Sequence, residues 1–216
     1  MPGPLYLAYG ANMNGSLLAH RLGRENAGTF ARRRGVLRGY RLVFAKVSSR
    51  DPEIGYGSVV PEAGCEVEGV LNALTEAELT QLDAIELVPR HYVRRVMCVY
   101  EPTIGAEVEA HLYIASPNRC RHGLVPVGSY LRRMAEGGDL LSRDYLQMLA
   151  ELSCLDDASI DGDDLLGSAL ARRALTSCAG RAACRARADP SATRPSRPSR
   201  TLRCGPCAHA DGAGAR

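Results

Sequence analysis

Two short segments constrain the fold of this chain more than any other feature. Leu5–Asn12, with the sequence LYLAYGAN, is a short apolar strand that runs into a glycine turn. Leu82–Pro89, with the sequence LDAIELVP, is the end of a helix, because the proline forbids further helix. Strands that end in Gly-x-Asn and glutamates near helix ends are each common, so the information lies in the order and separation of the two segments.

Together the two segments resemble the γ-glutamylcyclotransferase family, over residues 4 to about 155. The family pattern is an N-terminal Tyr-Gly-Ser-Asn loop that holds the substrate, followed by a Leu-Asp-x-x-Glu-Gly-Val stretch whose Glu is the catalytic base. This chain departs from it at Ala11, where the family usually has Ser, and at Leu87, where it usually has Gly. If the second position needs a left-handed backbone, Leu87 costs about 1–2 kcal/mol and can shift the carboxylate of Glu86.

The composition of the chain changes sharply toward its C-terminus. Residues 167–216 contain 10 Arg, 2 Asp, no Lys and no Glu, which gives a formal charge of +8, whereas the whole chain carries +3. The same residues contain 13 Ala and 4 Pro but no aromatic side chain, so they have little with which to build a core. We therefore predict a γ-glutamylcyclotransferase-like domain over residues 1–160 and a disordered basic tail rich in Ala, Arg, Pro and Ser over residues 161–216.

The hydrophobic pattern of the domain predicts many strands and few helices. Strands are predicted at 5–9, 27–34, 40–47, 57–61, 66–72, 92–100 and 107–114. Helices are predicted at 16–22 and 75–86, and near 128–136 and 142–153. Because the helices are segregated rather than alternating strictly with the strands, the pattern indicates an α+β fold. The family resemblance implies a small mixed β-barrel with a few peripheral helices.

The predicted helix over 75–86 begins at a capping box formed by Thr75 and Glu78. Leu79 and Leu82 share one helix face with Glu86, so the carboxylate is directed toward the interior. Burial, the helix dipole and the like charge of Asp83 should all raise the pKa of Glu86 from ~4.3 toward the range of a general base. The alternative is that Glu86 turns out to water at a frayed helix end.

The loop after the first strand has two possible roles. The spacing of Gly10 and Gly15 matches a phosphate-binding loop, but Ser16 and Leu17 stand where that motif requires Lys and Ser or Thr. What remains is a strand-to-helix turn whose backbone N–H groups could stabilise a carboxylate or an oxyanion, or else a plain tight turn. The resemblance implies that substrate binds the following residues: Tyr9, Gly10, Ala11, Asn12, Tyr92, Tyr113 and Tyr130. Each of the last three tyrosines could equally be an ordinary half-buried residue, and His91 is an alternative base.

The resemblance implies an amide-cleaving acyltransferase or lyase of glutathione metabolism. In that reaction the α-amine of a γ-glutamyl amine or peptide attacks its own γ-carbonyl, with Glu86 as proton shuttle, and 5-oxoproline leaves together with a free amine or amino acid. The reaction needs no metal and no cofactor. A non-catalytic module on the same fold that binds a small ligand or a protein partner is the alternative.

Several other features bear on location and partners. No apolar run approaches the roughly 18 residues of a membrane span, so a cytoplasmic protein without a membrane partner is expected. Four cysteines are scattered singly through the domain, and we expect them to be buried thiols: Cys65, Cys98, Cys120 and Cys154. We interpret the Cys204 and Cys207 pair as part of the tail rather than a redox or zinc site. The basic tail could attract nucleic acid, but we interpret it as solvated; the oligomeric state stays open, a homodimer being one option.

Overall fold

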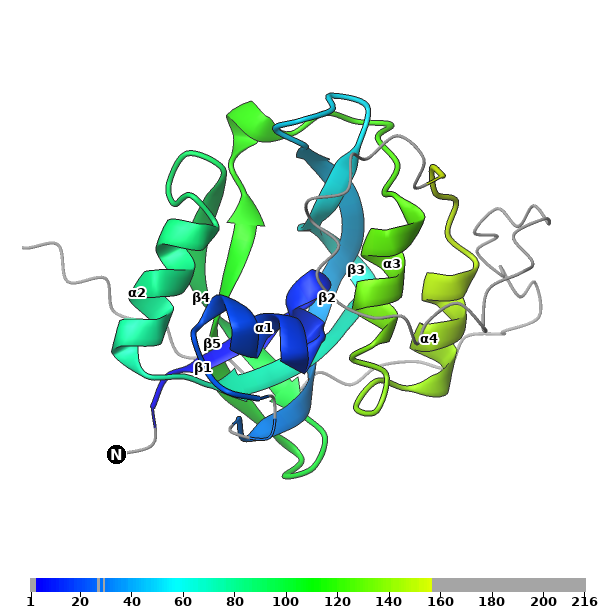
Figure 1. Ribbon diagram of the computed structural model, residues 1–216. Helices are drawn as coiled ribbons and strands as arrows, with labels where there is room; N and C mark the ends of the chain where they lie inside the picture. The colour runs from blue at the N-terminus through cyan, green and yellow to red at the C-terminus, as the bar shows by residue number, and fades with distance from the viewer. Residues whose placement is uncertain (1–2, 27, 29, 157–216) are drawn as a thin grey trace, which may run out of the picture. The chain divides into compact units, whose positions relative to one another are not determined.

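The computed structural model describes residues 3–26, 28 and 30–156. A closed barrel of five strands in the order β1-β3-β2-β4-β5 forms the centre of this region (Figure 1). The strands are β1 (Leu5–Ala8), β2 (Arg32–Val47), β3 (Gly55–Ala73), β4 (Tyr92–Glu101) and β5 (Ala106–Ala115). Neighbouring strands are antiparallel except for β1 and β5, which are parallel. The predicted α+β fold, a small mixed barrel with peripheral helices, is confirmed.

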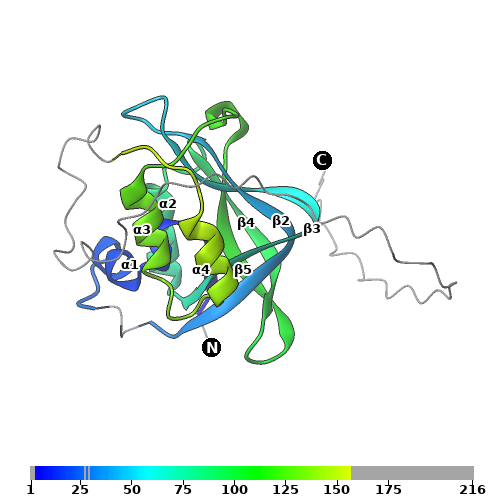
Figure 2. The ribbon, with the colours of Figure 1, turned by 90° about the vertical axis from the view of Figure 1, so that its right-hand side faces the viewer.

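Four α-helices of the described region lie outside the barrel, and all of them were predicted within a few residues of their ends. They are α1 (Gly15–Arg21), α2 (Glu76–Ile85), α3 (Gly128–Ala135) and α4 (Arg143–Ala150). Two 3-10 turns, η1 (Ala11–Met13) and η3 (Pro117–Arg119), follow β1 and β5. The view in Figure 2 shows α3 and α4 side by side in front of the barrel, with α2 on its opposite side. The β1–α1 connection and the end of α2 therefore reach the same barrel from different directions.

The predicted breaks within the long strands are wrong. Residues 32–34 of the first predicted segment and all of segment 40–47 belong to the single strand β2, which begins at Arg32 rather than at 27. Segments 57–61 and 66–72 both belong to β3. Gly39 and Gly64 stand at the expected breaks with φ values of +77° and +82°, and the β2–β3 register shifts between Arg38 and Tyr40. Glycine in the left-handed region lets a strand bend at a bulge without ending.

The core fills the barrel and extends beneath the helices. Fully buried side chains from the strands include Leu7, Leu37, Leu71, Val99 and Leu112. A Cβ atom added to Gly35 would lie within 2.9 Å of Leu71, Leu7 and Val99, so glycine leaves the room that these side chains occupy. Close packing of this kind fixes the barrel wall that supports the site.

The described cysteines form no disulfide, but they are not buried as predicted. Cys98 and Cys120 are exposed, while Cys65 and Cys154 are half-buried. In β4 the residue after Cys98 is the fully buried Val99, so alternation along the strand places the Cys98 thiol on the outer face. No helix within the described ranges has the length and apolar character needed to cross a membrane. The tail predicted over 161–216, with Cys204 and Cys207, lies outside the described residues.

Candidate active site

A pocket of about 240 Å³ lies where the β1–α1 turn, the end of α2, the barrel wall and α3 meet. It is lined by Tyr6, Tyr9, Gly10, Ala11, Asn12, Arg21, Lys46, Tyr56, Gly57, Ile85, Glu86, Tyr92, Tyr113, Tyr130 and Arg133. Every site residue predicted from the sequence is among these. Because pockets for drug-sized ligands typically enclose ~300–1,000 Å³, this pocket suits a small molecule.

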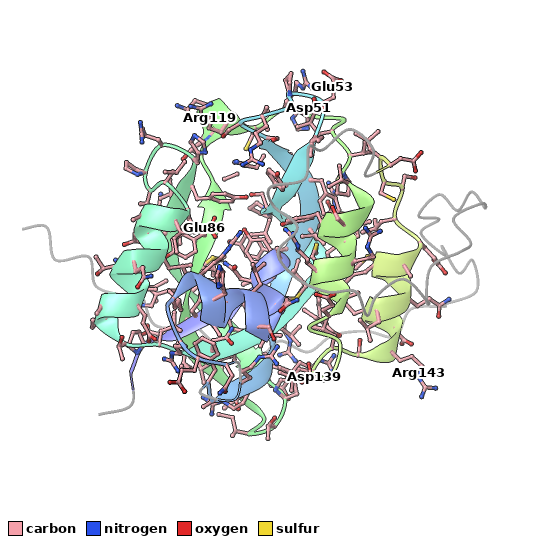
Figure 3. All side chains as sticks on the ribbon, in the orientation of Figure 1. Asp51, Glu53, Glu86, Arg119, Asp139 and Arg143 are labelled. Carbon is pink, nitrogen blue, oxygen red and sulfur yellow. The ribbon has the colours of Figure 1, made fainter. Side chains whose placement is uncertain are left out.

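Local sequence in α2 sets the position of Glu86. The capping box between Thr75 and Glu78 is present at the start of the helix, and Leu79 and Leu82 are buried on the face predicted to be internal. The helix ends at Ile85, and Glu86 is its C-cap with 17% of its side chain exposed. Figure 3 shows Glu86 turned toward the interior from the end of α2, whereas Arg143 projects outward from α4.

Asn12 joins the β1–α1 turn to Glu86. Its side-chain amide donates to Glu86 Oε1 at 3.2 Å and to the Tyr6 hydroxyl at 3.0 Å. Arg21 Nη1 in turn donates to Asn12 Oδ1 at 2.8 Å and lies 3.7 Å from Glu86 Oε1. The segments Leu5–Asn12 and Leu82–Pro89 are therefore linked by a hydrogen bond. Because Arg21 donates to Asn12 Oδ1, it fixes the orientation of the Asn12 amide.

The pKa of Glu86 is raised above its ordinary value, and burial of the carboxylate is the largest cause. The Arg21 charge, the Asn12 hydrogen bond and the Lys46 charge each oppose the rise. The expected contribution from Asp83 is absent because that carboxylate faces the barrel instead. Asp83 accepts a hydrogen bond from the Tyr113 hydroxyl at 2.9 Å and lies 3.4 Å from Arg94. A carboxylate with a raised pKa can both take and return a proton near neutral pH.

Tyr130 lies directly over two glycines of the pocket wall. The Gly57 N–H donates to the Tyr130 hydroxyl at 3.1 Å, and the Ala11 backbone amide also bonds to this oxygen. A Cβ atom added to Gly10 would lie 2.6 Å from the same oxygen, so glycine is needed for this close approach. Burial raises the pKa of Tyr130 to about 12, which keeps its proton in place at neutral pH. Within the described part of the chain nothing accepts that proton, so the hydroxyl can donate to a ligand.

Other tyrosine hydroxyls tie the pocket walls together. The Tyr92 hydroxyl donates to the Gly57 carbonyl at 3.1 Å, and the Tyr9 hydroxyl donates to the Tyr113 carbonyl. Burial raises the pKa of both Tyr9 and Tyr92 well above the ordinary tyrosine value. These hydroxyls are therefore neutral donors that are already satisfied by the backbone, and we assign them a wall-forming position.

The protein-family comparison identifies the chain. The family model described as gamma-glutamyl cyclotransferase, AIG2-like, matches residues 6–132. The chain belongs to this family. No curated protein matches the chain.

Solved structures agree with this family at the level of the fold. A structure of a gamma-glutamyl cyclotransferase has a TM-score of 0.64 and 21% identity, covering 74% of this chain and 94% of that one. An uncharacterized protein from Homo sapiens has a TM-score of 0.65 and 21% identity, covering 76% of this chain and 96% of that one. The Bacillus subtilis protein YkqA has a TM-score of 0.57 and 19% identity, and the match covers 70% of this chain and 56% of that one.

Leu87 stands where the family pattern usually has Gly, and the neighbouring Glu86 still lines the pocket. Leu87 has a φ of +54°, so the left-handed backbone considered from the sequence is present and is occupied by a branched residue. Its side chain is 39% exposed and lies outside the pocket. Glu86 still accepts a hydrogen bond from Asn12 with this residue in place.

Reasoning from sequence missed the cationic residues of this cyclotransferase-family pocket. Arg21, Lys46 and Arg133 all line it, whereas His91, the alternative base, does not. Arg21 is reachable from sequence in hindsight, since it ends the short helix that follows Asn12. Lys46 also left a signal, because it is the only lysine in a chain of 216 residues. Nothing in the local sequence places Arg21 or Lys46 in the pocket, because the pocket forms only when the barrel closes.

Proposed function

We propose that the protein is a γ-glutamylcyclotransferase that releases 5-oxoproline from a γ-glutamyl amine or peptide. The observation that carries this proposal is the Glu86 carboxylate, which has a raised pKa, lies in a pocket of small-molecule size and is hydrogen-bonded to Asn12. A buried carboxylate held in this way is suited to proton transfer.

The proposed reaction is an intramolecular acyl transfer. Glu86 takes a proton from the α-ammonium of the substrate, and the freed amine attacks the γ-carbonyl carbon to close a five-membered ring. Protonated Glu86 gives its proton to the leaving nitrogen as the bond to that nitrogen breaks. The carboxylate then takes the remaining extra proton from the ring nitrogen and passes it to the departing amine or to water. Because nucleophile and carbonyl belong to one molecule, the enzyme has only to fold the substrate and move the proton.

The oxyanion formed during attack requires donors fixed in advance. We assign this role to the backbone amides of Gly10 and Asn12 and to the Tyr130 hydroxyl, whose oxygen accepts from the Ala11 and Gly57 amides. An O–H that accepts from the backbone on one side has its proton available on the other, which suits it to a developing negative charge. Ala11 has no side-chain hydroxyl, unlike the Ser that the family usually has here. We propose that the Tyr130 hydroxyl serves as the hydrogen-bond donor in its place.

The direct test is a screen of γ-glutamyl amides with detection of 5-oxoproline. We expect the parent protein to release 5-oxoproline in equal amount to the free amine. If no γ-glutamyl compound gives 5-oxoproline but one of them binds in the pocket, the protein is the non-catalytic binding module that the departures at Ala11 and Leu87 allow.

A further inference from the structure

Lys46 is the only lysine of the chain, and it lies in the pocket. It belongs to β2, near the end of the strand, opposite Tyr56 of β3. The residue is only 6% exposed. Since the sequence otherwise uses arginine for positive charge, a compact ammonium occupies this one position.

The Lys46 ammonium has no anionic partner of its own. Nζ lies 5.0 Å from the centre of the Tyr56 ring and 5.7 Å from that of Tyr92. In the part of the chain that the structure describes, no carboxylate forms an ion pair with it and no group accepts a hydrogen bond from it. Aromatic rings return roughly 0.5–2 kcal/mol, which is less than burial of an ammonium costs. A buried charge left in this state at a pocket wall is suited to an anion brought by a ligand.

The substrate of the proposed reaction has at least one carboxylate, but that group belongs elsewhere in the pocket. The α-carboxylate and the α-amine are attached to the same carbon, and the amine must face Glu86. Arg21, 3.7 Å from the Glu86 carboxylate, is the cation next to that position. Lys46 lies over Tyr56 and Tyr92 and forms no ion pair with Glu86, although its charge lowers the pKa of that carboxylate.

We propose that Lys46 binds a carboxylate on the leaving group, and so selects γ-glutamyl derivatives of α-amino acids over those of simple amines. This inference rests on the proposed function. A γ-glutamyl amino acid has two carboxylates and one ammonium, to which we assign Arg21, Lys46 and Glu86 among the charged residues of the lining. A γ-glutamyl alkylamide would leave the Lys46 ammonium buried without a partner.

The test compares γ-glutamylalanine with γ-glutamylethylamide, which differ only in the leaving-group carboxylate. With the parent we expect kcat/KM to favour γ-glutamylalanine by on the order of 10- to 100-fold. Lys46→Met should abolish the preference by lowering kcat/KM for γ-glutamylalanine far more than for γ-glutamylethylamide, whereas Lys46→Arg, which keeps the charge, should retain part of the preference. Rates are compared on the plateau above the acidic limb, because the loss of this charge also raises the pKa of Glu86. The pH is kept below the range in which Lys46 titrates, since burial lowers the pKa of the lysine.

Two readouts do not depend on turnover. Lys46→Met should leave the Kd for 5-oxoproline unchanged, because that product carries only the α-carboxylate. Selective 13C-lysine labelling gives a single side-chain NMR signal, since the chain has one lysine. In the slow Glu86→Gln background, γ-glutamylalanine should move this signal much further than γ-glutamylethylamide.

Three results would overturn the inference while leaving the proposed function intact. These are equal turnover of the two substrates by the parent, an equal loss for both in Lys46→Met, or a Kd for 5-oxoproline weakened by about 10-fold or more, which would assign Lys46 to the α-carboxylate. Release of 5-oxoproline from neither substrate would overturn the proposed function and this inference together.

Discussion

Glu86 is the residue on which the proposed chemistry depends. Glu86→Gln keeps the shape of the side chain and its contact with Asn12 but cannot accept the ammonium proton. We expect kcat to fall by roughly 100-fold or more with little change in substrate affinity. Initial rates of 5-oxoproline release measure the effect, and an unchanged rate in this variant would remove Glu86 from the mechanism.

Asp83→Asn is the matched control for loss of a carboxylate from the same helix. Asp83 contacts Tyr113 and Arg94 rather than Glu86, so the loss of activity should be far smaller than in Glu86→Gln. Any residual effect should act through the Tyr113 hydroxyl and therefore be reproduced by Tyr113→Phe. An Asp83→Asn defect as large as that of Glu86→Gln would contradict the assignment of the proton shuttle.

The pH dependence of turnover follows from the charges around Glu86. The basic form of the carboxylate is the active one, so kcat/KM should rise with pH through a pKa above the ordinary Glu value. Arg21 lowers this pKa more than Lys46 does. Arg21→Gln should therefore move the acidic limb to higher pH, and further than Lys46→Met. A limb that stays in place or moves to lower pH would show that a different group titrates.

Substitution of Leu87 by glycine should change the stability of the protein. Leu87→Gly removes a side chain from a left-handed backbone at an exposed position, so we expect a gain of about 0.5–1 kcal/mol after the entropy of the added glycine is subtracted. The midpoint of thermal unfolding should rise by about 1–4 °C. Ala84→Gly, at an exposed right-handed position of α2, is the control and should lower it.

At the scale of one element, Glu78 in the first turn of α2 and Glu86 at its C-cap have opposite effects on stability. The pKa of Glu78 is lowered to about 2, chiefly by its hydrogen bonds with Arg24, one of which is 2.7 Å long. The pKa of Glu86 is raised by burial. Ionised Glu78 therefore stabilises the fold at neutral pH, and ionised Glu86 destabilises it.

The same substitution at the two positions tests this contrast. At pH 7, Glu86→Gln should unfold at a higher temperature than the parent. The difference should shrink as pH falls below the raised pKa of Glu86 and vanish below the ordinary Glu pKa. Glu78→Gln should lose on the order of 2 kcal/mol at pH 7, and this loss should fade as pH falls from the ordinary Glu pKa toward about 2. Thermal melts across this pH range measure both, and shifts of the same sign would refute the assignment.

Local signals explain which elements could be predicted. The capping box at Thr75, the buried pair Leu79 and Leu82, and Pro89 act within one helix, so sequence alone predicted α2 and the orientation of Glu86. Gly39 lies in the predicted break between strands 27–34 and 40–47, but the structure has a bulge there. A glycine is typical of both a bulge and a strand break, so its presence does not tell them apart. The partner across the barrel, not the local sequence, decides between them.

At the scale of the whole barrel, closure is what assembles the site. β1 pairs with both β3 and β5, which fixes the start of the β1–α1 turn against strands from much later in the chain. Asn12 thereby meets Glu86 across 74 positions of sequence, and Lys46 enters the same pocket from β2. The roles of Arg21 and Lys46 could not be read from sequence because they depend on this closure rather than on any local pattern.

We propose that residues 161–216 are dispensable for both folding and turnover. Every pocket-lining residue lies between Tyr6 and Arg133, and the last helix of the described residues, α4, ends at Ala150. Deleting residues 161–216 changes the formal charge from +3 to −2, so retention on a cation exchanger should be lost. Turnover and the unfolding midpoint should not change.

A longer deletion provides the control. Removal of residues 143–216 takes away α4, whose buried Tyr145 and Leu149 belong to the core. Loss of these two side chains should cost several kcal/mol and lower the unfolding midpoint strongly. If the shorter deletion alone lowered turnover or the midpoint, residues 161–216 would belong to the folded domain, and the boundary proposed from composition would be wrong.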